Sequence, residues 1–324
     1  MIDLKDINAN LENDLLRFNE ALKEAAQSNV ELINIVINYM LKNKGKQLRP
    51  TLCLLSSRLI SEPNKSTITA ASLIEMIHVA TLVHDDIVDN ADIRRGWPSV
   101  KSVWKNKASL LVGDYLFSKA LSNMIKLRSF DALEVLSETA SRLSEGELLQ
   151  MQYSKIKSMD ESIYLKMVSD KPASLFSAAS KIGAITVEAT REQQEALRSF
   201  GEKLGIAFQI KDDLFDVMGS QSSVGKPVGF DVKKNIMTLP FIHFMSNLNS
   251  SDRSKYKSKL KLHSKNKNIV EIRRMINDSG SIAYTEDFMS KISSDAISDL
   301  DIFEDSDAKK SLILLVEYNL ERVK

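Results

Sequence analysis

Two short acidic segments, each embedded in an apolar run, constrain this chain more than any other feature. Both have the spacing Asp-Asp-x-x-Asp, and together they contain Asp85, Asp86, Asp89, Asp212, Asp213 and Asp216. Residues four apart lie on one face of an α-helix, one turn along its axis. Each segment therefore predicts a row of carboxylates on one side of a helix.

The surroundings of these carboxylates favour a binding site over a solvated helix face. A single acidic stretch on a helix is usually just solvated, but both stretches here are flanked by apolar residues such as Leu82, Ile87, Ile210 and Leu214. Carboxylates gathered in an apolar setting are costly unless cations lie between them. Hard divalent ions, above all Mg²⁺, suit oxygen ligands and leave room for substrate phosphates. If the two helices face each other, the pattern predicts a metal-bridged phosphate or diphosphate site between them.

The rest of the chain has the period of α-helices. Apolar residues recur at intervals of three and four, as in the row Leu133, Leu136, Ala140 and Leu143, and alternating strand patterns bounded by Asn-Gly or Asp-Gly are absent. No Gly- or Pro-rich linker divides the chain, and the polar stretch 249–268 is expected to be a solvated connection. We therefore predict an all-α protein with a single domain over residues 1–324. The expected helices span 3–26, 30–43, 48–60, 67–91, 107–126, 130–154, 160–184, 191–218, 236–249, 266–278, 281–299 and 306–322.

Composition excludes several other classes of protein. The net charge is +1, so no global electrostatic case exists for binding nucleic acid or an anionic membrane. Cys53 is the single cysteine, which precludes an internal disulfide and is expected to be a buried small hydrophobe. The first residues do not read as a signal peptide, and no stretch is expected to approach the roughly 20 apolar residues of a membrane span. We expect a cytoplasmic protein without a transmembrane segment.

Two basic pairs are candidates for binding phosphate. Lys46 and Arg49 lie around an expected helix start, where cations add to the exposed N–H groups. Arg94 and Arg95 follow the first acidic segment and precede a Gly-Trp-Pro turn, and arginine suits bidentate binding of phosphate. The alternative for both pairs is a solvated basic surface, and alone it would be preferred for Lys46 and Arg49. The position of Arg94 and Arg95 directly after Asp89 favours a functional role.

Other polar residues are more ambiguous from the sequence. Lys171 precedes Pro172 at an expected helix break, and a surface lysine is as plausible there as one that reaches into a cavity. Lys226 lies in a Gly/Pro loop that could close over phosphates or be an ordinary connection. His78 lies two turns before Asp85, yet a lone histidine on an apolar helix is more often a core residue. For the helix glycines Gly113 and Gly146 we favour close helix packing, because glycine within a helix costs about 1 kcal/mol relative to alanine.

Taken together and in order, these segments resemble the trans-isoprenyl diphosphate synthases, the polyprenyl synthetase family, from about Lys44 to Pro240. The resemblance implies an antiparallel helical bundle around a deep central cavity, the isoprenoid synthase type I fold, and usually a homodimer. It implies three Mg²⁺ ions on the six aspartates, with the most direct contacts from Asp85, Asp89 and Asp212. It implies that isopentenyl diphosphate is bound by Lys46, Arg49, His78 and Arg95. The allylic diphosphate, farnesyl or geranyl, would be bound by Arg94, Lys171, Gln209 and Lys226, and Lys171 and Lys226 would join the three aspartates as catalytic residues.

The chain departs from the family pattern in two places. Pro172 follows Lys171 where the family commonly has threonine, and Asn235-Ile236 precede Thr238-Leu239-Pro240 where the family commonly has Gly-Lys. One hydroxyl contact and one phosphate-facing lysine are thereby lost. These changes motivate an alternative, a non-catalytic partner subunit of a heteromeric synthase, which the two complete acidic segments argue against.

The implied reaction is a 1'-4 trans condensation of an allylic diphosphate with isopentenyl diphosphate. The small residues Ala80 and Thr81 stand where short-chain members of the family place a bulky aromatic. We therefore predict a product longer than C15, of the octaprenyl type. The floor of the cavity would come from Met76, Ile77 and Leu73, with Phe117 or Met124. The alternative is a short-chain geranylgeranyl or farnesyl diphosphate synthase.

Overall fold

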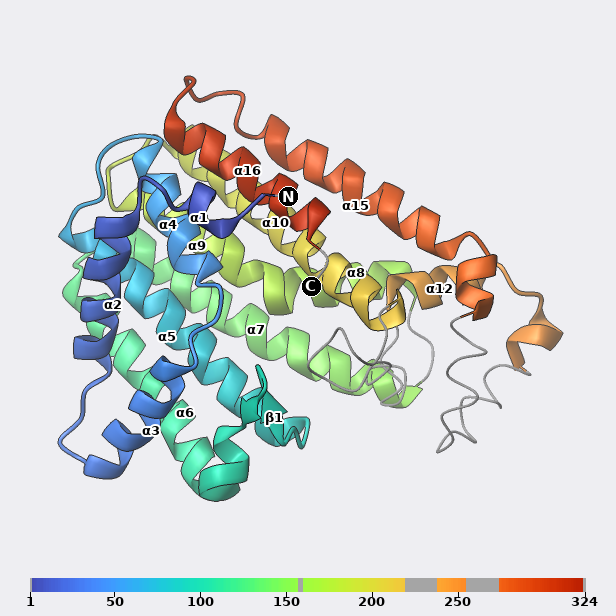
Figure 1. The fold of residues 1–324 in the computed structure, drawn as a ribbon, viewed down its shortest axis with the longest axis horizontal. Helices are drawn as coiled ribbons and strands as arrows, with labels where there is room; N and C mark the ends of the chain where they lie inside the picture. The colour runs from blue at the N-terminus through green and yellow to red at the C-terminus, as the bar shows by residue number, and fades with distance from the viewer. Residues whose placement is uncertain (1, 157–159, 219–237, 255–273, 323–324) are drawn as a thin grey trace.

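The structure is a computed structural model that describes residues 2–156, 160–218, 238–254 and 274–322. Nearly all elements in these ranges are helices, which confirms the predicted fold class (Figure 1). The helices are α1 (Leu4–Ile7), α2 (Glu12–Ala26), α3 (Glu31–Lys42), α4 (Leu48–Arg58), α5 (Lys65–Val88), α6 (Val100–Lys126), α7 (Phe130–Ile156), α8 (Glu161–Val168), α9 (Ser174–Ile185), α10 (Arg191–Met218), α12 (Leu239–Ser246), α15 (Ser281–Ser298) and α16 (Asp307–Glu321). A π-helix, η1 (Ser169–Ala173), joins α8 to α9, and β1 (Ile93–Arg94) pairs with β2 (Trp97–Pro98) in an antiparallel hairpin.

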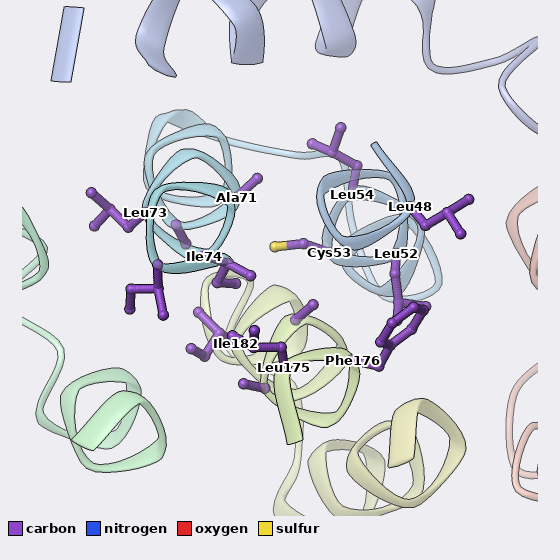
Figure 2. Packing of buried hydrophobic residues seen from close by; sticks show 14 of the residues in the cluster. Leu48, Leu52, Cys53, Leu54, Ala71, Leu73, Ile74, Leu175, Phe176 and Ile182 are labelled. Atoms are coloured by element: carbon purple, nitrogen blue, oxygen red, sulfur yellow. The ribbon is translucent and has the colours of Figure 1, made fainter. Parts of the chain in front are cut away.

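Three helices form the centre of the apolar core. Figure 2 shows side chains of α4, α5 and α9 pointing toward one another, with the sulfur of Cys53 enclosed between them. Cys53 is fully buried, as predicted, and burial raises the pKa of its thiol to about 12. A Cβ at Gly183 of α9 would lie 2.3 Å from the backbone oxygen of Cys53, so only glycine allows this approach of α9 to α4.

Helix α10 connects this core to a second apolar cluster. Its first half packs with α9 through Leu197, Phe200 and Leu204, and its second half packs with α8, α12 and α15 through Ile210 and Leu214. Figure 1 shows α10, α15 and α16 side by side along one edge of the molecule. The second acidic segment therefore lies in the half of α10 that belongs to the second cluster.

Several predicted helix bounds were wrong, each for a local reason. The expected helix 3–26 is divided, because the turn at Asn8 and Leu11 sends α1 against α16 and α2 against α5. The helix expected from 107 is joined, across a kink at Lys105, to a preceding helical stretch that begins at Val100, since Ser99 caps that stretch by accepting from the backbone N–H of Ser102. The span 160–184 is helical throughout, and the wider π turn accommodates Pro172. The short β-hairpin was not predicted, and the expected helix 266–278 lies largely outside the described residues.

Helix α5 stands out among the described helices because it is both long and strongly apolar. By length and composition alone it could cross a membrane, contrary to the expectation that no stretch comes near that size. However, 67% of its apolar window is buried inside the protein. Burial of this extent is that of a core helix, and the helix ends in the first acidic segment.

Candidate active site

The first acidic segment ends α5, where the helix dipole disfavours negative charge. Asp85 and Asp86 occupy the last turn, and Asp89 is the C-cap, with its backbone N–H donating to the carbonyl of Asp85. The negative end of the dipole makes carboxylates unfavourable at this position. No basic residue lies in the last turn of α5, so the neutralising cations come from other elements.

Lys171 supplies one of these cations. Its Nζ lies 3.7 Å from Oδ2 of Asp85, forms an ion pair with Glu147 of α7, and donates to Oε1 of Gln150 at 3.3 Å. Burial raises the pKa of Asp85 to about 6, and Glu147 and Asp89 add to the shift, whereas Lys171 and Arg94 oppose it. Burial alone would lower the pKa of Lys171, but the charges of Asp85 and Glu147 raise it. The π turn thus holds a charged lysine against the first acidic segment.

Arg94 supplies a second cation from the β-hairpin. Its Nε donates to Oδ1 of Asp86 at 2.7 Å, and the Asp86 side chain is almost completely buried. The hairpin can fold back toward α5 because Arg95 and Gly96 adopt positive φ angles in the turn. The hairpin thus turns Arg94 toward the carboxylates, and its predicted role in binding phosphate stays a prediction.

A basic cluster lies along the same helix, nearer its middle. Nη1 of Arg49, in the first turn of α4, lies 3.1 Å from Nε2 of His78, and its guanidinium lies 4.6 Å above the ring of Phe176. Burial lowers the pKa of Arg49 to about 10. Burial also lowers the pKa of His78 well below its usual value, and the charges of Arg49 and Arg95 add to this. His78 is therefore a neutral imidazole that offers a donor and an acceptor.

Arg95 reaches this cluster by passing over Gly45. A Cβ on Gly45 would lie 2.4 Å from Nη2 of Arg95, so the glycine provides the space for the guanidinium. Nη1 of Arg95 donates to the carbonyl of Asn43 at 3.2 Å. Lys46, which is exposed, lies 5.3 Å from the ring of Tyr318 in α16. These contacts bring the two basic pairs of the sequence analysis to neighbouring positions.

Other side chains of the protein donate hydrogen bonds to the carboxylates of the second acidic segment. Oδ2 of Asp213 accepts from the hydroxyl of the buried Tyr164 at 2.6 Å, and Oδ1 accepts from Nε2 of Gln209 at 2.9 Å. Burial, followed by the charge of Asp213, raises the pKa of Tyr164 well above its usual value, so the hydroxyl keeps its proton. Oδ1 of Asp212 lies 2.7 Å from Nη2 of Arg322.

Electrostatic interactions of Arg49 link helix α5 with the second acidic segment on α10. Helices α5 and α10 both pack against α9, and Arg49 interacts with the charges of both Glu75 on α5 and Asp212 on α10. Among the described residues, no three carboxylate, histidine or cysteine side chains are gathered closely enough to hold a metal ion. Instead, Asp85, Asp86 and Asp212 each face a cation of the protein. Convergence of the six carboxylates on one set of metals stays a prediction.

The donor set nevertheless fits a hard divalent cation. It consists of carboxylate oxygens, and the burial that raises the pKa of Asp85 is the setting in which a carboxylate benefits from a nearby cation. Lys226 and the departure at Asn235-Ile236 lie outside the described residues. The other predicted site residues are described, and their roles toward metal and substrate stay predictions.

Four residues that sequence reasoning did not select now belong to the site. Glu147 neutralises Lys171, Tyr164 donates to Asp213, Arg322 pairs with Asp212, and Glu75 lies buried near Arg49. Glu75 could have been noticed as a charged residue in an apolar helix. The other three depend on contacts between distant parts of the chain. The close packing expected of the helix glycines is confirmed: Gly113 lies against the His84 ring, and Gly146 lies against the π turn at Lys171.

Comparison with known proteins agrees with this geometry. A family model described as polyprenyl synthetase matches residues 30–278. The chain is 32% identical to octaprenyl diphosphate synthase of Escherichia coli (strain K12) over 321 residues, which cover 99% of each protein. A crystal structure of a decaprenyl diphosphate synthase from Rhodobacter capsulatus is 31% identical, with a TM-score of 0.94 and coverage of 99% of this chain and 100% of that one. A polyprenyl synthase from Caulobacter crescentus CB15, complexed with calcium and isoprenyl diphosphate, is 30% identical, with a TM-score of 0.93 and coverage of 99% and 98%.

Proposed function

This chain belongs to the polyprenyl synthetase family of trans-isoprenyl diphosphate synthases and is a prenyltransferase, and on that premise we propose which product it makes and with which metal. We propose that it condenses an allylic diphosphate, farnesyl or geranyl, with isopentenyl diphosphate by a Mg²⁺-dependent 1'-4 trans reaction. The product would be a polyprenyl diphosphate longer than C15, of the octaprenyl type. The single observation that supports this proposal is the buried Arg49–His78 cluster, in which His78 lies on the helix of the first acidic segment and Arg49 interacts with the charge of Asp212 in the second.

Divalent metal would be held by the two acidic segments. Enzymes of this family use divalent metal ions. When bound, Mg²⁺ would supply Lewis-acid stabilisation of a departing diphosphate. The residues proposed to hold three such ions are Asp85, Asp86, Asp89, Asp212, Asp213 and Asp216. Lys171 and Arg94 lie beside Asp85 and Asp86, and we propose that they bind the allylic diphosphate when it enters with the metal.

The Arg49 cluster would bind the second substrate. Arg49 and Arg95 provide positive charge for the diphosphate of isopentenyl diphosphate, and neutral His78 can donate one hydrogen bond to it. Lys46, on the exposed side, would complete this group. Among the described residues near both acidic segments, the carboxylates are already paired with cations. None of them is an evident base for removing the proton. We therefore assign the proton that leaves the condensation product to the released diphosphate.

The proposed product length rests on the small side chains before Asp85. Ala80 is buried, with 1% of its surface exposed, and the hydroxyl of Thr81 donates to the carbonyl of His78. Both side chains are small, and they lie about one helical turn before the acidic segment. Met76, Ile77 and Leu73 are also buried, as is Met124 of α6, and they remain the proposed floor.

We propose that the protein acts as a cytoplasmic homodimer. Large apolar side chains are exposed on α6 and α7, where a second copy could cover them: Leu110, Leu111, Ile125, Phe130, Leu148 and Met151. Exposed apolar surface of this extent is typical of interfaces. Light scattering after gel filtration would test the assembly state, and Leu111→Asp is expected to shift it toward a monomer.

Product analysis of the purified protein tests the whole proposal. Incubation with farnesyl diphosphate, isopentenyl diphosphate and Mg²⁺ should yield polyprenyl diphosphates longer than C20, sized after removal of the diphosphate. From this primer, a product that ends at C20 would support the short-chain alternative, as would a product that ends at C15 or C20 when geranyl diphosphate is the primer. If isopentenyl diphosphate is not consumed with any allylic primer, the non-catalytic partner subunit becomes the better account, and the departures at Pro172 and Ile236 would explain it.

A further inference from the structure

The end of the C-terminal helix makes an unexpected contact with the second acidic segment. Arg322, the C-cap of α16, places its guanidinium 2.7 Å from Oδ1 of Asp212, although the two residues are far apart in the sequence. Two further contacts of α16 lie next to it: Leu320 accepts a hydrogen bond from Nζ of Lys211 at 2.7 Å, and Tyr318 lies beside Lys46. The end of α16 therefore forms one wall of the site.

The Arg322 guanidinium is fixed in place independently of Asp212. Its Nε donates to Asn319 at 2.9 Å, its Nη2 donates to the carbonyl of Phe208 at 2.8 Å, and the group lies 3.8 Å from the centre of the Phe208 ring. Only 4% of the side chain is exposed. Arginine does not lose its proton in proteins. Asp212 thus has a permanent positive charge beside it that cannot withdraw into solvent.

Lys171 at the first segment is a different kind of partner. It stands 3.7 Å from Asp85, its side chain is 23% exposed, and its bonds are to side chains that can follow it. A flexible lysine can yield its place to another cation. A guanidinium anchored to the backbone cannot do so at the same low cost, so its charge persists when a metal approaches.

We propose that Arg322 is a positioning residue that makes divalent-metal binding at the second acidic segment depend on a bound diphosphate. This inference rests on the proposed function, because it assumes that Asp212 is a metal ligand. The fixed positive charge repels a cation that approaches Asp212 alone. A diphosphate brings several negative charges, which offset that repulsion. Arg322 also holds the Asp212 carboxylate in one orientation, so the segment is ordered before either ligand binds.

The coupling has a thermodynamic consequence that can be measured. If diphosphate strengthens metal binding by some factor, the metal must strengthen diphosphate binding by the same factor. Removal of the Arg322 charge should therefore strengthen binding of the metal alone and reduce this factor. A residue with a merely structural role would weaken both bindings or leave both unchanged.

The experiment is a titration of the full chain with Mn²⁺, followed by calorimetry or electron paramagnetic resonance, with and without inorganic pyrophosphate. Free Mn²⁺ is corrected for its complex with pyrophosphate. Arg322→Gln is expected to bind Mn²⁺ alone about fivefold more tightly than the wild type, and pyrophosphate should strengthen its binding by a smaller factor. Arg322→Lys keeps the charge but places it on a flexible stem without the guanidinium's anchoring contacts, so its affinity for Mn²⁺ alone should lie between those of the wild type and Arg322→Gln. Lys203→Gln is the matched control, because it breaks the 2.8 Å pair of α10 with Asp299 away from the site.

The outcomes separate this inference from the proposed function. If the wild type binds Mn²⁺ but Arg322→Gln binds it equally or more weakly, the inference is overturned and the proposed function stands. If the wild type binds no Mn²⁺ even with pyrophosphate, both fall. Should Arg322→Gln fail to fold, Phe208→Leu takes its place, because it removes the ring that lies against the guanidinium and so loosens it, while the charge and the hydrogen bonds to Asn319 and to the backbone carbonyl of residue 208 stay. That variant should bind Mn²⁺ alone about twofold more tightly, and an unchanged affinity would count against the inference.

Discussion

The two acidic segments share a spacing but differ in what holds them. At the first, the charged partners Lys171 and Arg94 have side chains that are 23% and 25% exposed, and they come from a π turn and a two-strand hairpin. At the second, the partners Tyr164 and Arg322 are almost fully buried and belong to the packed frame of α8 and α16. The comparison suggests that the first segment is built to exchange partners when substrate binds. The second is ordered in advance.

The largest effect is expected when a carboxylate is removed from the first acidic segment, whose cationic partners can exchange. Asp85→Ala should lower turnover by about a thousandfold, equivalent to about 4 kcal/mol of transition-state stabilisation, because the first segment would lose one of its proposed metal ligands. The fold should persist, since Asp85 is only half buried and its burial is unfavourable to the charged form. Steady-state kinetics and circular dichroism measure the two effects. Asp287→Ala, an exposed aspartate of α15, is the control, and near-normal turnover in Asp85→Ala would refute the assigned role.

Glu75 extends the comparison to a carboxylate outside both acidic segments, because it is buried in the middle of α5. Burial raises its pKa from 4.5 to about 7, although Arg49 and Arg95 oppose the shift. The folded state then keeps its proton up to about pH 7, whereas the unfolded state loses it near pH 4.5. The folded state binds more protons between these values, so this group lowers the free energy of unfolding as pH rises from about 4.5 to 7.

Glu75→Gln should remove that slope. The variant and the wild type should have similar stability at pH 5, and at pH 8 the variant should be more stable by up to about 3 kcal/mol, from 1.36 kcal/mol per pKa unit. Urea unfolding at the two pH values measures the difference. Since other groups titrate equally in both proteins, identical slopes would show that Glu75 ionises normally in the folded state. His78, Arg49 and Arg95 are the charged or titratable neighbours on which the result depends.

A substitution of Lys171 tests the first acidic segment without replacing any carboxylate. Lys171→Gln leaves Asp85 and Glu147 as uncompensated like charges and removes a phosphate-binding cation, so turnover should fall by about a hundredfold. Stability should change by about 1 kcal/mol or less, because burial already raises the pKa of Asp85 to about 6, so this carboxyl can take up a proton when the lysine charge is lost. Lys166→Gln is a matched control: this lysine pairs with Asp170 one turn away and is 61% exposed. Equal kinetics of the two variants would show that Lys171 has no special role.

The sequence was sufficient to predict what repeats locally. The helical period of rows such as Leu133, Leu136 and Ala140 predicted the helical class, and the paired spacing of the segments at Asp85 and Asp212 is the basis of a predicted site that stays a prediction. Helix bounds differed where a short polar signal decides them. Asn8 ends α1 within the expected first helix, and Ser99 begins a helical stretch that joins the helix expected from 107 across a kink at Lys105.

What could not be predicted depends on contacts between distant segments. Nothing near Tyr164 or Arg322 indicates that these residues meet α10, since the hydrogen bond of Tyr164 spans 49 positions and the contact of Arg322 with Phe208 spans 114. The sequence predicts a helix over 306–322, but not which of its side chains meet α10. Only packing of α8 and α16 against α10 reveals that both residues are buried donors.

Tyr164 provides the converse test, because it orients a carboxylate of the second acidic segment before any ligand binds. Tyr164→Phe removes the 2.6 Å hydrogen bond to Asp213 and leaves a carboxylate with 6% exposure short of one donor. Loss of one hydrogen bond to a buried charged group costs about 1.5–2 kcal/mol, so the urea midpoint should fall. Turnover of the folded variant should fall by less than tenfold, because Gln209 still orients Asp213. This pattern is opposite to that of Lys171→Gln, which loses turnover and keeps stability. If both variants lost turnover and stability together, the distinction between an exchangeable and a fixed segment would be wrong.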